Sequence, residues 1–166
     1  MSRVSTPTEQ ESGGFQLKDL ASISSSDRQS FVEMVSKIEK KSFPASEAFD
    51  FNTELRKKNV RMVLAVQSDE STRVIGYLVY LRMKRLAFLH KICVVEHERG
   101  KGVAGYLMHS LFQQLKKTGC CNVQLWVDEN RTPARALYES YGFQQIDRCI
   151  DYYGPGRTAL KMQSSI

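Results

Sequence analysis

Apolar residues recur along the chain with two different spacings, and their succession predicts the order of strands and helices. Alternating or wholly apolar runs predict strands over residues 15–20, 60–67, 74–82, 86–95, 122–127, 143–150 and 158–162. Apolar residues three or four apart predict a helix that ends before Pro44 and further helices over residues 47–58, 103–118 and 131–141. The order β-α-α-β-β-β-α-β-α-β-β predicts an α+β fold, one mixed sheet with helices on its faces.

The length of 166 residues suits one domain. Residues 1–14 are polar and end in Gly13-Gly14, so we expect a disordered leader followed by a single domain over residues 15–166. No apolar run is long enough to span a bilayer, and no apolar segment of a secretory signal follows Met1. The four cysteines and three histidines lack metal-ligand spacing, which indicates reduced thiols, no metal, and a cytoplasmic or nuclear location.

The formal net charge of +6 suits an anionic partner, such as a polyphosphate cofactor, a nucleic acid or a membrane surface. The basic residues occur in short, scattered clusters, without an arginine-rich arm or an aromatic and basic RNA-binding signature. We therefore expect neither a nucleic acid nor a membrane as partner.

Residues 89–105 form the segment that predicts chemistry. A buried strand leads into a basic turn with glycines, which opens a helix. The first amides of a helix lack intrahelical acceptors, and the helix dipole favours negative charge there. Gly100 and Gly102 would let a phosphate approach the backbone, and Arg99 and Lys101 add positive charge. The turn has neither the Gly-Lys-Ser/Thr of a P-loop nor the G-x-G-x-x-G spacing of a dinucleotide site.

Two motifs in this chain resemble those of the GNAT superfamily of acyl-CoA-dependent N-acetyltransferases. Arg99-x-x-Gly102-x-Ala104 matches the superfamily's R/Q-x-x-G-x-G/A motif. Residues 134–143 resemble its later strand–helix segment, A-x-x-L-Y-x-x-x-G-F. The resemblance covers roughly residues 15–163. It implies a mixed, mostly antiparallel sheet flanked by helices on both faces. It also implies direct transfer of an acetyl group from acetyl-CoA, as co-substrate, to a primary amine in a ternary complex.

The resemblance also implies which residues bind acetyl-CoA. The strand before the turn would hold the pantetheine arm, a backbone amide near Val94 would polarise the thioester, and the amides of the turn would bind the pyrophosphate. The implied residues are Ile92, Cys93, Val94, Arg99, Gly100, Lys101, Gly102, Val103, Ala104, Gly105 and Tyr138. The superfamily's asparagine near the start of the last helix is replaced by Arg131 and preceded by Asn130, so either residue is a candidate cofactor contact.

The resemblance assigns the proton donor more directly than the base. Tyr138 matches the superfamily's helix tyrosine, which implies that it protonates the departing thiolate. Two common base positions hold Trp126 and Phe88. His90 lies two residues after Phe88, on the same strand face, and matches a histidine of the arylalkylamine N-acetyltransferases. Asp128, at the end of the next strand, is the second candidate base.

Within the superfamily the chain is most similar to the protein N-terminal acetyltransferases, including the RimI-like ribosomal enzymes. Glu39-x-x-x-Phe43-Pro44 resembles their peptide-lining loop, and Tyr152-Tyr153 with the segment that follows resembles their final hairpin. This implies that Phe43, Pro44, Tyr152 and Tyr153 bind the acceptor, a protein or peptide N-terminus. Two alternatives remain open. One is an acetyltransferase for lysine side chains or a small amine, and the other is a non-catalytic acyl-CoA-binding module.

Overall fold

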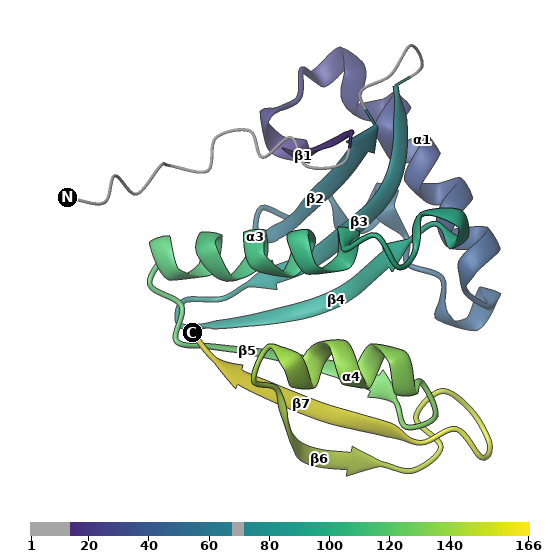
Figure 1. Ribbon diagram of the computed structural model, residues 1–166, viewed down its shortest axis with the longest axis vertical. Helices are drawn as coiled ribbons and strands as arrows, with labels where there is room; N and C mark the ends of the chain where they lie inside the picture. Colours follow the sequence, from purple (N-terminus) through teal and green to yellow (C-terminus); the bar gives the residue numbers. More distant parts are fainter. Residues whose placement is uncertain (1–13, 68–71) are drawn as a thin grey trace.

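A seven-stranded sheet forms the centre of the computed structural model, which describes residues 14–67 and 72–166 (Figure 1). Residues 1–13 of the predicted leader, and residues 68–71, lie outside the described residues. The strand order is β1-β2-β3-β4-β5-β7-β6, and every neighbouring pair is antiparallel except β4 and β5. The strands are β1 (Phe15–Asp19), β2 (Val60–Gln67), β3 (Arg73–Arg82), β4 (Leu86–Val94), β5 (Asn122–Asp128), β6 (Gln144–Cys149) and β7 (Ala159–Ser165). The predicted mixed, mostly antiparallel sheet is confirmed.

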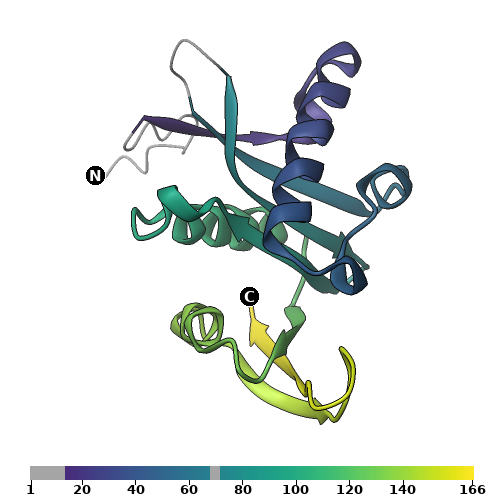
Figure 2. The same cartoon turned by 90° about the vertical axis from the view of Figure 1, so that its right-hand side faces the viewer.

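Helices cover both faces of the sheet, as predicted. Helices α1 (Ser25–Ser42) and α2 (Phe51–Glu54) lie on one face, and α3 (Val103–Lys117) and α4 (Thr132–Ser140) lie on the other (Figure 2). Each face has its own apolar core because each helix turns one stripe toward the sheet. None of the described helices is long and apolar enough to cross a membrane.

The second predicted helix is much shorter than expected. The sequence pattern predicted a helix over residues 47–58, whereas the structure has a 3₁₀ turn, η2 (Ala45–Glu47), and then the single turn of α2. Long-range bonds replace the helical ones here. The Glu47 carbonyl accepts a hydrogen bond from Lys91, and the Phe49 amide donates to the Glu39 side chain. Backbone groups held in this way are not available for an α-helical ladder.

Strands β4 and β5 separate part-way along their length. Their parallel pairing runs from Leu86 opposite Asn122 to Leu89 opposite Leu125 and goes no further. Beyond Leu89 and Leu125 the two strands diverge toward their carboxyl ends, and no strand of the described chain lies between them (Figure 1). The sheet is thus open at one place in its middle, and this opening positions the site described next.

Candidate active site

A cavity of about 430 Å³ occupies the opening between β4 and β5. Its walls come from both strands, from α4, from residues 43–50 between α1 and α2, and from the turn between β6 and β7. We call residues 43–50 the acceptor loop. Among the residues that the sequence assigned to cofactor, acceptor or catalysis, those that line this cavity are Phe43, His90, Ile92, Asp128, Arg131, Tyr138, Tyr152 and Tyr153. Segments far apart in the sequence therefore meet at one place.

A β-bulge at His90 sets which side chains of β4 face the cavity. Leu89 pairs with Tyr80 and Lys91 pairs with Val79, so His90 is the extra residue on its strand. The alternation of faces shifts at this point. Leu89 belongs to the core under α3 and α4, whereas Cys93, an even number of residues later, belongs to the core under α1 and α2. As a result, His90 and Lys91 both line the cavity.

The His90 imidazole lies between two phenyl rings. Its centroid is 5.5 Å from that of Phe49 and 5.2 Å from that of Phe88. Burial among these groups lowers the pKa of His90 below its ordinary value of 6.5. The imidazole is therefore neutral at pH 7 and able to accept a proton.

Asp128, the other candidate base, is already occupied as an acceptor. Its Oδ1 accepts the Asn130 amide at 2.9 Å, and its Oδ2 lies 3.0 Å from Nη2 of Arg157. The bond from the Asn130 amide, together with the Arg157 guanidinium, holds the pKa of Asp128 below its ordinary value. A carboxylate with both oxygens engaged and a lowered pKa is a weak base, so the geometry favours His90.

Tyr138 projects from α4 into the same cavity. The residue is only 8% exposed, and its hydroxyl makes no hydrogen bond to any described residue. Burial raises the pKa of Tyr138 to about 12, against an opposing effect of the Arg131 charge. The phenol is therefore fully protonated at neutral pH, with its hydroxyl free to bond a ligand.

The basic turn, residues 99–105, leads directly into α3. Gly100 and Gly102 have φ angles of +80° and +84°, which L-residues rarely adopt, and Gly102 is the N-cap of the helix. No side chain of a described residue caps α3, and its first turn has no acidic residue. The first amides of α3 are thus open to an anion, which fits the pyrophosphate of an acyl-CoA.

The charged side chains of this turn are engaged with the protein. Nε of Arg99 donates to the Val94 carbonyl at 3.0 Å and ties the turn back to β4. Nζ of Lys101 lies 3.0 Å from the Glu98 carboxylate, which compensates its charge. Lys101 is thus ion-paired, whereas Arg99 has no carboxylate partner among the described residues, so its charge and the backbone amides are the features of the turn that suit a phosphate.

Arg131 and Asn130 point to different places. The Arg131 guanidinium lies 4.8 Å from the centre of the Phe43 ring and lines the cavity on the side of the acceptor loop. Asn130 is exposed and does not line the cavity. Its backbone amide donates a hydrogen bond to the Asp128 carboxylate. Pro44 and Cys93 also lie outside the cavity lining, Pro44 on the surface and Cys93 in the core under α1.

Aromatic side chains form the far wall of the cavity. Trp126 on β5 stacks on Tyr152 with ring centroids 4.9 Å apart and an interplanar angle of 20°. Tyr152 in turn contacts Tyr153 edge to face. Beside them, Arg157 from the same turn is ion-paired with both Glu47 and Asp128. This pairing joins the acceptor loop to the turn between β6 and β7.

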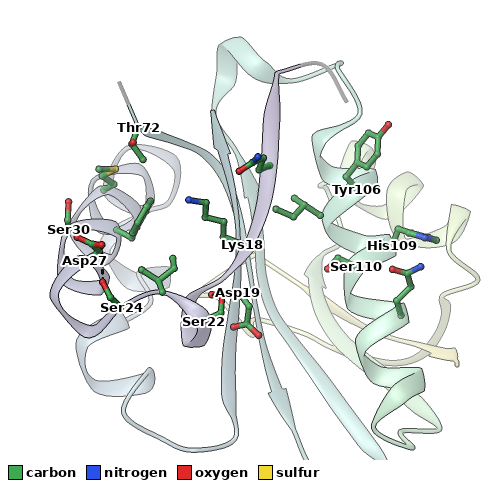
Figure 3. A pocket seen from close by; sticks show the side chains of 16 residues that line it. Lys18, Asp19, Ser22, Ser24, Asp27, Ser30, Thr72, Tyr106, His109 and Ser110 are labelled. Carbon is green, nitrogen blue, oxygen red and sulfur yellow. Dashed lines mark hydrogen bonds between the residues drawn. The ribbon is translucent and has the colours of Figure 1, made fainter. Parts of the chain in front are cut away.

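A larger groove lies elsewhere, along the edge strand β1 between α1 and α3 (Figure 3). Its volume is about 900 Å³, and its labelled lining includes Lys18 and Asp19 on β1, Asp27 on α1 and Tyr106 on α3. None of the candidate catalytic residues or residues of the basic turn lines this groove. The smaller cavity is therefore the candidate active site because the chemistry gathers there.

Comparison with known proteins decides the family. Residues 27–143 match the profile of the Acetyltransferase (GNAT) family, which is well over half of the chain. The chain belongs to the GNAT acetyltransferase family. Both motifs identified from the sequence fall within the matched region, one at the start of α3 and the other on α4.

Two GNAT proteins of similar sequence are named for different molecules. The [ribosomal protein bS18]-alanine N-acetyltransferase of Haemophilus influenzae is 32% identical over 84 residues, which are 51% of this chain and 57% of that protein. A mycothiol acetyltransferase of Brachybacterium faecium is 39% identical over 52 residues, which are 31% of this chain and 16% of that protein. The chain thus spans less than two-thirds of the length of these relatives.

Comparison with a solved structure shows that nearly the whole fold is similar, beyond the region that matches in sequence. The ribosomal-protein-S18-alanine N-acetyltransferase from Escherichia coli superposes with a TM-score of 0.75 at 20% sequence identity. The superposition covers 92% of this chain and 94% of that one. The GNAT fold therefore extends beyond the region of clear sequence similarity.

Sequence reasoning missed two residues that shape this GNAT site, Lys91 and Glu47. The bulge puts Lys91 on the same strand face as His90, and Glu47 was expected inside a helix. The pattern of Glu39, Phe43 and Pro44 was the available signal, since it marked this loop as part of the acceptor side. It gave no hint of the ion pairs that hold the loop.

Proposed function

We propose that this GNAT protein transfers the acetyl group of acetyl-CoA to the α-amine of a protein N-terminus. One observation carries the proposal. The cavity in the opened sheet brings the unbonded Tyr138 hydroxyl and the neutral His90 imidazole together with an aromatic acceptor wall. The bS18-alanine N-acetyltransferases, one similar in sequence and one in fold, support a peptide acceptor.

Residues of β4 and of the basic turn would hold acetyl-CoA, which supplies an activated acetyl thioester. Beyond Leu89, β4 has no neighbouring strand on its β5 side within the described chain, so its backbone groups there are available to the pantetheine arm. The amides at the start of α3 would take the pyrophosphate, with Gly100 and Gly102 keeping side chains out of the way.

His90 and Tyr138 divide the proton transfers. The acceptor arrives as an ammonium and must lose a proton before its nitrogen can attack the thioester carbonyl. His90 accepts that proton, directly or through a water, because burial keeps the imidazole neutral. Tyr138 gives its hydroxyl proton to the sulfur as the carbon–sulfur bond breaks. With a pKa of about 12, the phenol gives its proton only when negative charge has built up on the sulfur.

The acceptor would enter between the acceptor loop and the turn that carries Tyr152 and Tyr153. Phe43 and Tyr152 offer apolar surface for the first side chains of a peptide, and both line the cavity. The four free cysteines support a reducing compartment, the cytoplasm or nucleus, where new protein N-termini are available.

A thiol-release assay with acetyl-CoA and matched acceptors tests the proposal. The panel contains free N-terminal peptides, the same peptides blocked at the N-terminus and carrying an internal lysine, and small amines such as a polyamine and an arylalkylamine. We expect turnover with the free N-terminal peptides only. Turnover confined to the blocked peptides or the small amines would move the protein to another acceptor class. CoA binding without turnover of any acceptor would indicate a non-catalytic acyl-CoA-binding module.

A further inference from the structure

A buried ion pair lies beneath the acceptor loop and is not used in the proton transfers above. Nζ of Lys91 lies 2.5 Å from Oε1 of Glu39, and the two side chains are 12% and 2% exposed. Glu39 also accepts a hydrogen bond from the Tyr77 hydroxyl, which is itself buried. Burying two charges costs free energy unless each is well paired, so a pair held this deeply calls for a structural or functional reason.

Both members of the pair reach from the core to the acceptor loop. Oε1 of Glu39 accepts the Phe49 amide at 3.1 Å. Nζ of Lys91 donates to the Glu47 carbonyl at 2.7 Å and lies 3.6 Å from the centre of the Phe43 ring. The loop has only one 3₁₀ turn of regular structure. Apart from the backbone bonds of that turn, its beginning, middle and end are thus held by two side chains.

Glu47 extends this anchor across the opening in the sheet. Its carbonyl is bonded to Lys91 on β4, and its carboxylate is paired with Arg157, which also pairs with Asp128 on β5. Lys91 directly follows His90 at the bulge. One chain of polar contacts therefore connects the strand of the candidate base, the acceptor loop and the turn that carries the aromatic wall.

We propose that Lys91, paired with Glu39, is a positioning residue that holds the acceptor loop in register with His90; this inference rests on the proposed function. Ordering a loop during binding costs conformational entropy, and a loop already held in place removes that cost. Lys91 does not touch the reacting atoms in this proposal. It acts through Phe43 and Glu47, so its loss weakens acceptor binding and leaves acetyl-CoA binding intact.

The variant Lys91→Met keeps the aliphatic stem and removes the ammonium. We expect the KM for the peptide to rise about tenfold, the equivalent of one charge-assisted hydrogen bond, while acetyl-CoA affinity stays within about twofold of wild type. The control is Arg148→Met, which breaks an exposed ion pair with Glu129 on the other half of the sheet. It should change neither quantity. An unchanged peptide KM in folded Lys91→Met would overturn the proposal.

A double variant separates positioning from simple stability. Glu39→Gln/Lys91→Met leaves no buried charge of this pair without its partner. The side-chain amide that replaces the Glu39 carboxylate can still bond Tyr77 and Phe49, but the bond to the Glu47 carbonyl stays lost. We expect the melting temperature to recover relative to Lys91→Met while the peptide KM stays raised. Recovery of KM together with the melting temperature would show a merely structural role and overturn the proposal.

Hydrogen exchange tests the anchor without relying on activity. The backbone amides of residues 45–50 should exchange faster in Lys91→Met than in wild type, while those of α3 should not change. Equal exchange in the loop would overturn the anchor even if the wild-type protein acetylates peptides. Faster loop exchange in a protein that acetylates no peptide would support the anchor and overturn the proposed function instead.

Discussion

His90 and Lys91 are consecutive residues of one strand, yet both side chains face the same cavity. In a regular strand they would point to opposite faces of the sheet. The bulge removes that alternation at the point where β4 and β5 separate. A neutral base candidate and a buried cation are thereby brought to one wall, where the proposed roles of the imidazole and the ammonium are to accept a proton and to hold the acceptor loop.

The glycine at the N-cap of α3 should be required for acetyl-CoA. Gly102→Ala places a methyl group on a residue with φ of +84°, next to the free amides. Gly119→Ala is the matched control, because Gly119 has φ of +78° and open space around it at the far end of the helix. Both variants should lose about 1 kcal/mol of unfolding free energy from the left-handed backbone. In calorimetry only Gly102→Ala should bind CoA more weakly, and equal affinities would refute this site for the phosphate.

Removing the Tyr138 hydroxyl should slow the reaction without weakening cofactor binding. Tyr138→Phe keeps the ring and its packing on Phe143 but removes the only proton that the side chain can give. We expect kcat to fall by about 10²-fold or more, the scale of general acid catalysis, with CoA affinity nearly unchanged. Steady-state kinetics and calorimetry measure the two quantities. Full activity in Tyr138→Phe would assign the proton donor elsewhere.

The pH dependence of kcat/KM should report His90. A base works only when neutral, so activity is lost as the pH falls through the pKa of the imidazole. Because burial lowers that pKa, the acidic limb should lie below pH 6.5. His90→Gln should lower kcat and remove this limb. A limb that persists unchanged in His90→Gln would shift the role to Asp128 or to bulk water.

Loss of the exposed aromatic wall should raise the KM for the peptide and leave the affinity for acetyl-CoA unchanged. Tyr152→Ala removes the ring that stacks on Trp126, so we expect a raised peptide KM with unchanged acetyl-CoA affinity. Ile150→Ala is the control, since Ile150 is two residues away and is 67% exposed. If both variants handle peptides like wild type, the acceptor does not use this wall.

The parts of the site that were predictable from the sequence are those that depend on neighbouring residues. The strand, turn and helix around Gly102 follow from local apolar spacing and glycine, and so does the helix that carries Tyr138, whereas the role expected of Tyr138 comes from the resemblance to the GNAT superfamily. What depends on distant contacts was not predictable. The helix expected over residues 47–58 does not form at its start, where Lys91 and Glu39 engage the Glu47 carbonyl and the Phe49 amide.

Arg131 illustrates the same limit for a side chain. Its sequence position matches a cofactor contact of the superfamily, whereas its guanidinium lies over Phe43, a residue far earlier in the chain. The bulge at His90 is equally invisible in the sequence, because a strand with one extra residue has the same composition as a regular one. Tertiary packing decides both features.

The early end of the β4–β5 pairing also has a mechanical meaning. Within the described chain, the pairing of Leu86–Leu89 with Asn122–Leu125 is the one part of the sheet ladder that joins its two halves. Past it the two halves are joined by side chains, through the Glu47–Arg157 ion pair on one face and the shared apolar core under α3 and α4 on the other. A ligand that fills the gap would contact both halves at once, so its binding should raise the stability of the whole domain against unfolding.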